Sequence, residues 1–415
     1  MGIHTKESHR DSCSGFTATA NGSVSTLPLQ RLEALQMRLM DAVRLSSENC
    51  LGKIEGKGHF RRQYHPSLSP PGWHLGHCVY VECLWVRSNL CGDSKLERRL
   101  RNFYVPELVP KENRGKFLPA QDELIGWADR LMEEHRVMLE SPSVKAASDR
   151  MLENDYLVHF LIHHHAQHLE IVSMANVARH AASAWNDYRV IEELSPCDPS
   201  MPGQRLDSGC YHVGGGPEFS YDNELPRQKV ELRALDIASR PVTNAEYLEF
   251  IRDGGYRNRE WWSGGGWTWV TRQKVRHPGR WRQDMSGLWF EINFDGPSDL
   301  EAKASVTGIT RFEAGAFAAW AGARLPHEFE WEAAARAGTL DGVGEVWEWC
   351  ANTFHPYPGF RAHPYREYSV PWFDHRHFVL RGGCTHSAVE IKRPGFRNYY
   401  LADADYLFAG IRLAK

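Results

Sequence analysis

The stretch His163-His164-His165-Ala166-Gln167-His168-Leu169-Glu170 decides the fold of the N-terminal half of this chain. It lies within a helical pattern that runs from about Asn154 to Arg179. One face of that helix carries, at steps of four and three, Leu157, Leu161, His164, His168 and Ile171. Two imidazoles therefore stand one turn apart where a bundle helix normally carries Leu or Ile, which is the spacing for binding one metal ion. The pair alone leaves open whether they are metal ligands or ordinary core or surface histidines.

A second predicted helix carries a third histidine on its apolar face. The segment Ser69-Pro70-Pro71-Gly72 precedes this helix, which runs from about Trp73 to Asn89. His77 lies on the apolar face, whereas His74, near the helix start, could be solvated. Three neutral imidazoles from two helices leave coordination positions open, which is typical of a catalytic iron site rather than a closed zinc site.

The neighbours of these histidines have less defined roles. By helical spacing, His163 and His165 point to other faces of their helix, and we assign them no ligand role. Glu170 lies two residues beyond His168. Its carboxylate could contact one of the metal-binding histidines without binding the metal itself, or it could be an exposed acid.

Two further amphipathic helices complete a predicted four-helix bundle. The first begins near Ser25-Thr26 and ends near Ser47, and the other spans about Gln121 to Leu139. Residues 91–118 have mixed charge and two prolines, so we expect a loop there. The core of an up-and-down bundle is a usual place for a metal.

Composition excludes several classes of protein. The 415 residues are enough for two domains, and a net charge of −3 argues against nucleic acid or an anionic membrane as a partner. No apolar run has membrane-spanning length. Residues 1–26 are rich in Ser, Thr and Gly without an apolar signal core, so we expect a disordered tail and no export. The nine scattered cysteines, with no CxxC pair, favour the cytoplasm.

The second half of the chain has a different pattern. Prolines and glycines mark a linker at 191–205, which separates a bundle at 27–190 from a domain at 206–415. Short strand-like pieces with abundant Gly and Trp then predominate, and helices are expected at Asn244–Ile251 and Arg311–Gly322. These features predict an α+β domain.

Five ordered motifs in this half resemble the formylglycine-generating-enzyme (sulfatase-modifying factor) fold, which is C-type-lectin-like. They are Pro241-Val242-Thr243-Asn244-Ala245-Glu246-Tyr247, Arg324-Leu325-Pro326-His327-Glu328-Phe329-Glu330-Trp331-Glu332, Glu345-Val346-Trp347-Glu348-Trp349, Leu380-Arg381-Gly382-Gly383 and Phe408-Ala409-Gly410-Ile411-Arg412. The resemblance implies the fold but not the activity. Formylglycine generation needs a cysteine pair in this part, and Cys384 has no partner close in sequence, so we do not expect that activity.

A histidine-bearing, DinB-like bundle ahead of such a domain resembles the ergothioneine-pathway sulfoxide synthases. Their pattern is Leu-x-His at a helix start and His-x-x-x-His-x-Glu, found here as Leu75-Gly76-His77 and from His164 to Glu170. The resemblance covers the chain from about Leu29 to Lys415. It implies that the cofactor is non-haem Fe(II), held by His77, His164 and His168. It also implies that iron and O2 join a chalcogen atom to the imidazole carbon of hercynine (N-α-trimethylhistidine).

The resemblance also points to substrate-binding and catalytic residues. By position, Gln167 and Asn398 match two residues that contact hercynine in that family. The quaternary ammonium of hercynine cannot donate a hydrogen bond and favours aromatic faces, for which the candidates are Phe396, Tyr399 and Tyr400. A tyrosine near the iron would donate a proton, and the candidates are Tyr104, Tyr365 and Tyr368. Packing or surface roles stay open for these residues, and the sequence does not choose among the tyrosines.

A departure from the family pattern indicates which molecule supplies the chalcogen atom. Members that use γ-glutamylcysteine carry Asp two residues and Arg six residues beyond the equivalent of Asn398, where this chain has Tyr400 and Ala404. A methyl group cannot replace a bidentate Arg contact. Free cysteine and the selenosugar 1-selenoglucose remain, and two adjacent tyrosines with Asp403 and Asp405 nearby favour the sugar. We therefore expect the activity of the selenoneine synthases in this family.

Three alternatives stay open. The chain could be an ergothioneine-type sulfoxide synthase that uses cysteine or another thiol, a DinB-like thiol transferase that needs no O2, or a non-catalytic scaffold. In the first two cases, as in the favoured one, the partners are small molecules. The sequence does not indicate an oligomeric state.

Overall fold

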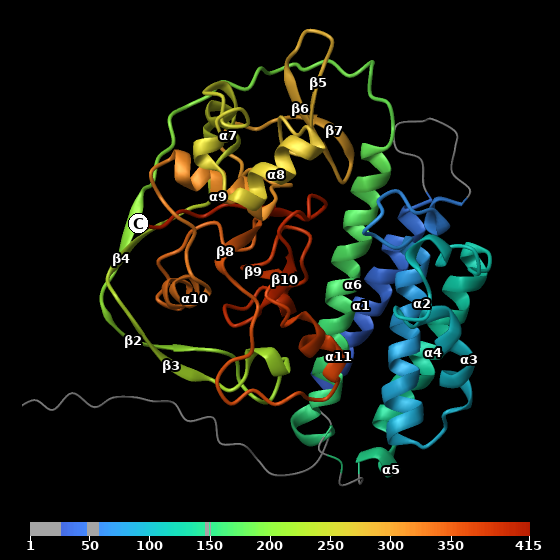
Figure 1. Cartoon of the computed structure of the whole chain (residues 1–415). Coiled ribbons are helices and arrows are strands. Elements are labelled where there is room, and N and C mark those ends of the chain that lie inside the picture. The colour runs from blue at the N-terminus through green and yellow to red at the C-terminus, as the bar shows by residue number, and fades with distance from the viewer. Residues whose placement is uncertain (1–25, 48–57, 146–148, 150) are drawn as a thin grey trace, which may run out of the picture.

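The chain has two parts, which meet along one long helix (Figure 1). We describe it from a computed structural model, in which residues 26–47, 58–145, 149 and 151–415 are described. The tail predicted at 1–26 lies outside these residues except for Thr26, where the first helix begins. The N-terminal part is a helical bundle, and the C-terminal part mixes short strands and helices, as the sequence predicted.

The four long helices of the predicted bundle are all present. They are α1 (Thr26–Leu45), α2 (Pro71–Glu82), α4 (Gln121–Glu140) and α6 (Tyr156–Ala181). Helix α2 continues as a π-helical segment, Cys83–Leu90. The apolar stripe of α1 has at most 2 % exposure at Leu32, Leu35, Leu39 and Val43. The bundle therefore forms because each stripe is covered by neighbouring helices.

The prediction of a loop over residues 91–118 is wrong in part. Helix α3 (Lys95–Tyr104) lies within that stretch, and the short helix α5 (Pro142–Lys145) follows α4. Leu96, Leu100 and Tyr104 follow one another at steps of four and pack on the bundle core. Charged residues cover the other faces of α3, and the two prolines come only after its end, so neither feature prevents a helix here.

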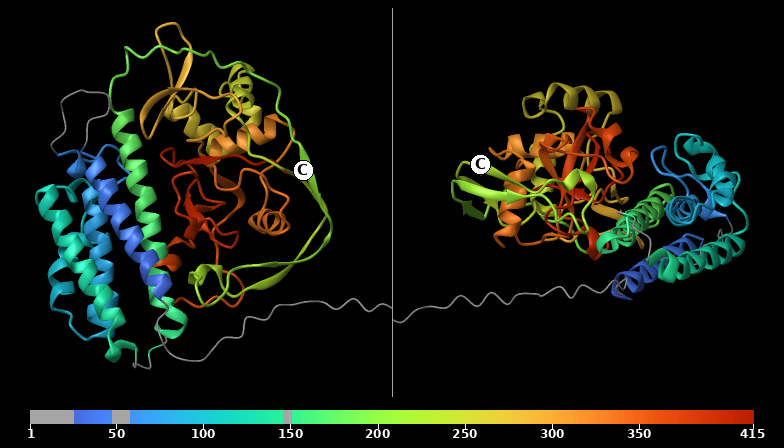
Figure 2. Two further views of the ribbon diagram at one scale, coloured as in Figure 1. Left: turned by 180° about the vertical axis from the view of Figure 1, so that it is seen from behind. Right: turned by 90° about the horizontal axis from the view of Figure 1, so that it is seen from below.

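Helix α6 lies between the bundle and the C-terminal part, as both views in Figure 2 show. Most of its residues are buried, including polar ones such as His163, His165 and Glu170. A helix covered on all sides has no solvent face, so its polar residues must find partners within the protein. One face of α6 therefore packs against the bundle, and another packs against the C-terminal domain.

The C-terminal domain is built from small sheets. The four-stranded sheet has the order β10-β9-β8-β11, with β8 (Trp347–Thr353), β9 (His377–Arg381), β10 (Asn398–Leu401) and β11 (Ala409–Gly410). Its pairs are antiparallel except β11 with β8. The other sheets pair β1 (Gly203–Leu206) with β4 (Leu235–Ala238), β2 (Gly209–Val213) with β3 (Gln228–Leu232), and β5 (Trp281–Gln283) with β6 (Trp289–Asn293) and β7 (Gly296–Asp299). Strand β1 begins inside the predicted linker.

Five α-helices accompany these sheets. They are α7 (Asn244–Arg252), α8 (Gly264–Gln273), α9 (Arg311–Trp320), α10 (Glu328–Arg336) and α11 (Arg366–Ser369). Helices α7 and α9 are the two that the sequence predicted. A threonine precedes each helix, and its hydroxyl accepts a hydrogen bond from the backbone N–H of the glutamate three residues later. The carboxylate of that glutamate in turn accepts a hydrogen bond from the backbone N–H of the threonine. This capping box fixes both helix starts.

Several charged residues of the sequence motifs form buried ion pairs in this domain. Glu328 accepts from Arg381 (2.7 Å) and Arg397 (2.7 Å and 2.8 Å), and Glu348 accepts from Arg412 (2.8 Å). All five side chains are almost completely buried. The motifs that carry the resemblance therefore include charges that hold the fold together.

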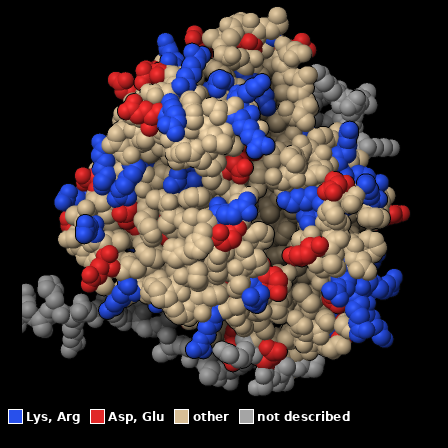
Figure 3. Space-filling view, viewed as in Figure 1, with Lys and Arg blue, Asp and Glu red and all other residues tan. Residues whose placement is uncertain are grey.

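The surface is of mixed charge. Figure 3 shows acidic and basic side chains interspersed over one face, with a hollow where the two parts meet. Among the described helices, none has the length and apolarity needed to cross a lipid bilayer.

Candidate metal centre

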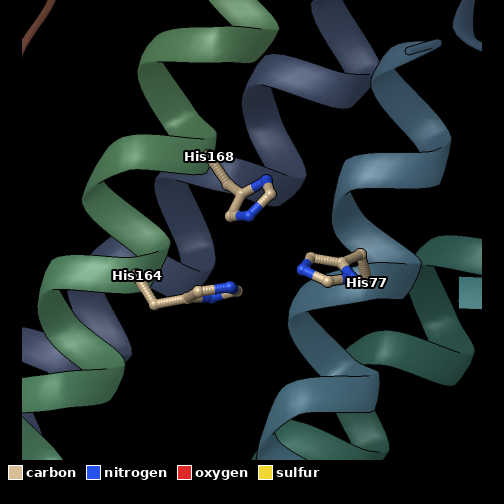
Figure 4. Close-up of side chains that lie close together, drawn as sticks. All are labelled: His77, His164 and His168. Atoms are coloured by element: carbon tan, nitrogen blue, oxygen red, sulfur yellow. The ribbon is translucent and has the colours of Figure 1, made fainter. Parts of the chain in front are cut away.

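Three imidazole rings converge between α2 and α6. His77 comes from α2, and His164 and His168 lie one turn apart on α6. The ring centroids are 5.2 Å apart for His77 and His164, 4.8 Å for His77 and His168, and 4.4 Å for His164 and His168. The three potential ligand nitrogens lie within 4.8 Å of one another, and Figure 4 shows the rings gathered between the two helices. The residues predicted from helical spacing are thus brought together in a group that could hold one metal ion.

The second nitrogen of each ring is engaged elsewhere. The Nδ1 atoms contact the carbonyl oxygen of Tyr104 (2.7 Å, from His77), the Sγ of Cys78 (3.9 Å, from His164) and the Nδ1 of His74 (2.9 Å, from His168). An imidazole whose Nδ1 is engaged presents its Nε2 to a metal, and such outer contacts orient the ring. The donor set therefore fits a divalent metal bound by three histidines.

The protein environment keeps these rings neutral. Burial lowers the pKa of His77 to about 4. Burial, together with the neighbouring histidines, lowers the pKa values of His164 and His168 well below the ordinary value. Only neutral imidazole has a lone pair to give to a metal, so all three rings are ready to bind at neutral pH.

His74 is a fourth buried histidine beside the group. Its side chain is only 5 % exposed, so the interpretation of a solvated histidine is wrong. Burial lowers its pKa well below the ordinary value. Through its Nδ1 contact with His168 (2.9 Å), it can hold that ring in place.

The two histidines that flank His164 in sequence have other partners. His163 contacts the guanidinium of Arg393 (3.1 Å), and His165 lies 2.8 Å from the buried carboxylate of Glu82. His163 therefore faces the C-terminal domain, and His165 faces the bundle core. Neither belongs to the three-ring group formed by His77, His164 and His168.

Gln167 lies where the C-terminal domain meets α6, one residue before His168. Its side-chain oxygen accepts hydrogen bonds from the hydroxyls of Tyr221 (3.1 Å) and Tyr368 (3.0 Å). These two tyrosine rings stack on each other with centroids 4.0 Å apart. Because both bonds use the oxygen, the amide nitrogen of Gln167 remains as a donor for another group.

Glu170 is buried at 2 % exposure, so the interpretation of an exposed acid is wrong. Its carboxylate accepts from the indole of Trp347 (2.8 Å) and from the hydroxyl of Ser387. Cys384 lies 3.6 Å from the same carboxylate, and burial raises the pKa of its thiol well above the ordinary value. Glu170 therefore fastens α6 to the C-terminal domain.

Three of the candidate substrate-binding residues lie on strand β10, and they do not all point to the same face. Asn398 and Tyr400 share one face, because side chains alternate along a strand. Tyr399 points to the other face and stacks on Phe354, with centroids 4.1 Å apart. Phe396, at 1 % exposure, packs between Tyr221 and Trp347. The surroundings of Tyr399 and Phe396 are those of packing residues.

The three candidate tyrosine proton donors have different surroundings. Tyr104 packs its ring against Trp127 and supplies the carbonyl oxygen that holds His77. Tyr368 donates to Gln167. Tyr365 lies edge-on to Trp85, and within the described part of the chain its hydroxyl has no hydrogen-bond partner. Burial raises the pKa of Tyr365 to about 12, so it is protonated at neutral pH.

Sequence reasoning missed Tyr221 as part of this group. It lies between β2 and β3, 54 residues from the glutamine it contacts, in a segment without regular periodicity. A fully buried tyrosine needs a hydrogen-bond partner, but no local pattern says which one. Only the packing of α6 against the C-terminal domain identifies it.

Comparison with known proteins places the chain in a family. The DinB superfamily matches residues 31–172, and the sulfatase-modifying factor enzyme 1-like domain matches residues 202–343 and 338–415. A hercynine oxygenase of Mycolicibacterium thermoresistibile is 31 % identical, over 85 % of this chain and 89 % of that protein. The chain belongs to the hercynine oxygenase family. A hercynine oxygenase of Mycolicibacterium smegmatis is 29 % identical, over 91 % of this chain and 98 % of the relative.

A more distant relative covers part of the chain. Ergothioneine biosynthesis protein 1 of Schizosaccharomyces pombe is 25 % identical, over 48 % of this chain and 28 % of that protein. Within the hercynine oxygenase family architecture, the three-ring group lies in the DinB part, while Tyr221 and Tyr368, which contact Gln167, lie in the other matched part. The surroundings of the candidate centre therefore draw on both domains.

Proposed function

We propose that this chain is a non-haem Fe(II)- and O2-dependent enzyme that joins selenium from 1-selenoglucose to the imidazole carbon of hercynine. The observation that carries the proposal is the group of three neutral imidazoles whose outer nitrogens are already engaged, beside an amide donor on the same helix. Membership of the hercynine oxygenase family supports hercynine as the substrate. When bound by these rings, Fe(II) would supply electrons to O2 and a common centre for the donor and hercynine.

The chain itself supplies binding and orientation. Tyr221 and Tyr368 hold the oxygen of Gln167, so its N–H points away from them and can donate to an acceptor nitrogen of an imidazole substrate. A neutral imidazole ring offers one such acceptor. Asn398 and Tyr400, on one face of β10, are the proposed contacts for the rest of hercynine. Holding the reactants together turns a three-body encounter into an intramolecular one.

Tyr365 is the proposed proton donor. The Tyr368 hydroxyl is committed to Gln167, whereas the hydroxyls of Tyr104 and Tyr365 have no hydrogen bond among the described residues. Of these two we favour Tyr365, because its ring reaches from the C-terminal part to Trp85 of the bundle. It stays protonated at neutral pH because burial raises its pKa to about 12. A free, protonated hydroxyl at the interface can give its proton to a developing anion.

The proposed selenium donor rests on residues after Asn398. Ala404 is buried and carries no charge where a donor with a carboxylate end would need a guanidinium. Asp405, half-exposed, lies 3.3 Å from His65. Carboxylates and tyrosine hydroxyls suit the hydroxyls of a sugar better than the acid end of a peptide. A thiol donor such as cysteine remains the alternative.

The test uses the full chain, prepared without oxygen and loaded with Fe(II). Hercynine is added with either 1-selenoglucose or cysteine, followed by O2, and product mass is measured. We expect a selenium adduct of hercynine only when iron and O2 are both present. If product forms in the reaction with cysteine but not in the reaction with 1-selenoglucose, selenium is excluded as the transferred atom, and the iron-dependent chemistry still holds. Thiol turnover without O2 would instead indicate a thiol transferase.

A further inference from the structure

An arginine, a tryptophan and a metal-facing histidine form a stack at the start of α2. The ring of Trp73 lies parallel to that of His77, with centroids 5.0 Å apart and an interplanar angle of 13°. The guanidinium carbon of Arg114 lies 4.0 Å from the Trp73 ring centroid. The charge of Arg114 therefore contacts a ring that in turn contacts a candidate ligand.

Arg114 is held firmly, although it lacks an acidic partner in its hydrogen bonds. The side chain donates to the carbonyl oxygens of Val109 (2.9 Å) and Pro106 (2.9 Å) and to the hydroxyl of Ser69 (2.7 Å). All three acceptors are neutral, and the residue is only 7 % exposed. Burial lowers the pKa of Arg114 to about 10, so it is charged at neutral pH. Glu107 and Glu112 act on this charge electrostatically, but neither is among its hydrogen-bond partners. A buried cation that is not neutralised by a bonded acid projects its field onto its surroundings.

Trp73 is fixed as well. Its indole N–H donates to the carbonyl oxygen of Phe103 (2.9 Å), and its side chain is 2 % exposed. The neighbouring carbonyl, of Tyr104, accepts from Nδ1 of His77. The end of α3 thus holds both the tryptophan and the histidine, and the stacked ring limits rotation of the imidazole.

We propose that Arg114 is a positioning residue of the metal centre, which acts on His77 through Trp73 and favours the ferrous over the ferric state. The inference rests on the proposed function, because it takes the metal to be iron. A nearby positive charge opposes the gain of charge when Fe(II) loses an electron. The same charge favours an anionic thiolate or selenolate donor at the centre.

The test compares variants of the full chain loaded with iron under anaerobic conditions. Arg114→Met removes the charge and keeps the aliphatic stem, whereas Arg114→Lys keeps the charge. The ratio of Fe(II) to Fe(III) is measured at a fixed potential in the presence of mediators. We expect the ratio to fall about tenfold in Arg114→Met, equivalent to about 59 mV for one electron. Arg114→Lys should restore most of the ratio.

Arg280 offers a matched control. It is also a buried arginine stacked over an aromatic ring, that of Phe408 at 4.3 Å, and it donates only to backbone carbonyls, at Tyr406 and Leu407. Burial lowers its pKa to about 10, as for Arg114. Arg280→Met should lower stability without changing the iron ratio, which separates a charge effect from general destabilisation.

A second variant keeps the inference testable if Arg114→Met does not fold. Trp73→Leu removes the stacked ring and should change the visible absorption spectrum of the Co(II)-substituted protein. An unchanged iron ratio in a fully loaded Arg114→Met protein, or an unchanged cobalt spectrum in Trp73→Leu, would overturn the inference alone. A wild-type protein that binds no iron would overturn the proposed function as well.

Discussion

At the scale of single residues, the candidate centre depends on how each imidazole is held. His77, His164 and His168 present one nitrogen to the group, while the other contacts a carbonyl oxygen, a thiol or a fourth histidine. Burial keeps them neutral. Removing any one ring leaves two ligands and a gap, and two histidines bind a divalent metal more weakly than three.

We therefore predict that His77→Ala, His164→Ala and His168→Ala each abolish bound iron. Metal analysis of the purified proteins after loading and desalting measures this directly. His163→Ala is the matched control, because it lies next to His164 but contacts Arg393 of the C-terminal domain. Full iron in any of the three variants would remove that residue from the ligand set.

At the scale of elements, the approach of α3 to α2 places one ligand. A Cβ added at Gly76 would lie 2.0 Å from the ring of Tyr104, so only glycine permits this approach. The same approach brings the carbonyl oxygen of Tyr104 to His77. By leaving room for the Tyr104 side chain, Gly76 therefore helps to hold the imidazole of His77 in place.

Gly76→Ala should accordingly push Tyr104 away and loosen His77. We expect metal affinity to fall about 10- to 100-fold, as for other outer contacts of metal ligands, and unfolding free energy to fall by about 1–3 kcal/mol. Titration with Co(II) and urea unfolding measure the two effects. Gly126→Ala on α4 is the control, since its Cβ would meet only the end of Arg130 at 3.6 Å. That variant should keep its affinity.

At the scale of the whole molecule, buried ion pairs hold the C-terminal domain that faces α6. Glu328 lies between two buried guanidiniums, those of Arg381 and Arg397. Burial by itself would raise the pKa of Glu328, but these two arginines outweigh it and lower the pKa from 4.5 to about 2. The carboxylate is thus more stable in the folded than in the unfolded chain, and its contribution is present above about pH 4.5.

Glu328→Gln should destabilise the protein by about 3–5 kcal/mol at neutral pH, because it leaves two buried charges without their partner. The difference from the wild type should shrink as pH falls from 4.5 toward 2, where the wild-type carboxyl takes up a proton. Urea unfolding at pH 7, 4 and 3 measures this. Asp41→Asn, which alters an exposed pair with Arg44, should change stability by less than about 1 kcal/mol. A constant difference across this range would contradict the prediction.

Local periodicity determined much of this protein from its sequence. Apolar residues at steps of three and four predicted α1, α2, α4 and α6, and the same spacing put two imidazoles on one face of α6. Such patterns can be read because residues one turn apart share a helix face whatever the rest of the chain does. Helix α3 was missed because its apolar stripe is short and the surrounding charges resemble those of a loop.

Tertiary structure alone decided which distant residues meet. It placed His74 against His168, brought the hydroxyls of Tyr221 and Tyr368 to Gln167, and buried Glu170 against Ser387, 217 residues away in sequence. It also turned Asn398 and Tyr399 to opposite faces of one strand. These contacts depend on how two domains pack along α6, and that packing is set by the summed burial of many residues rather than by any local pattern.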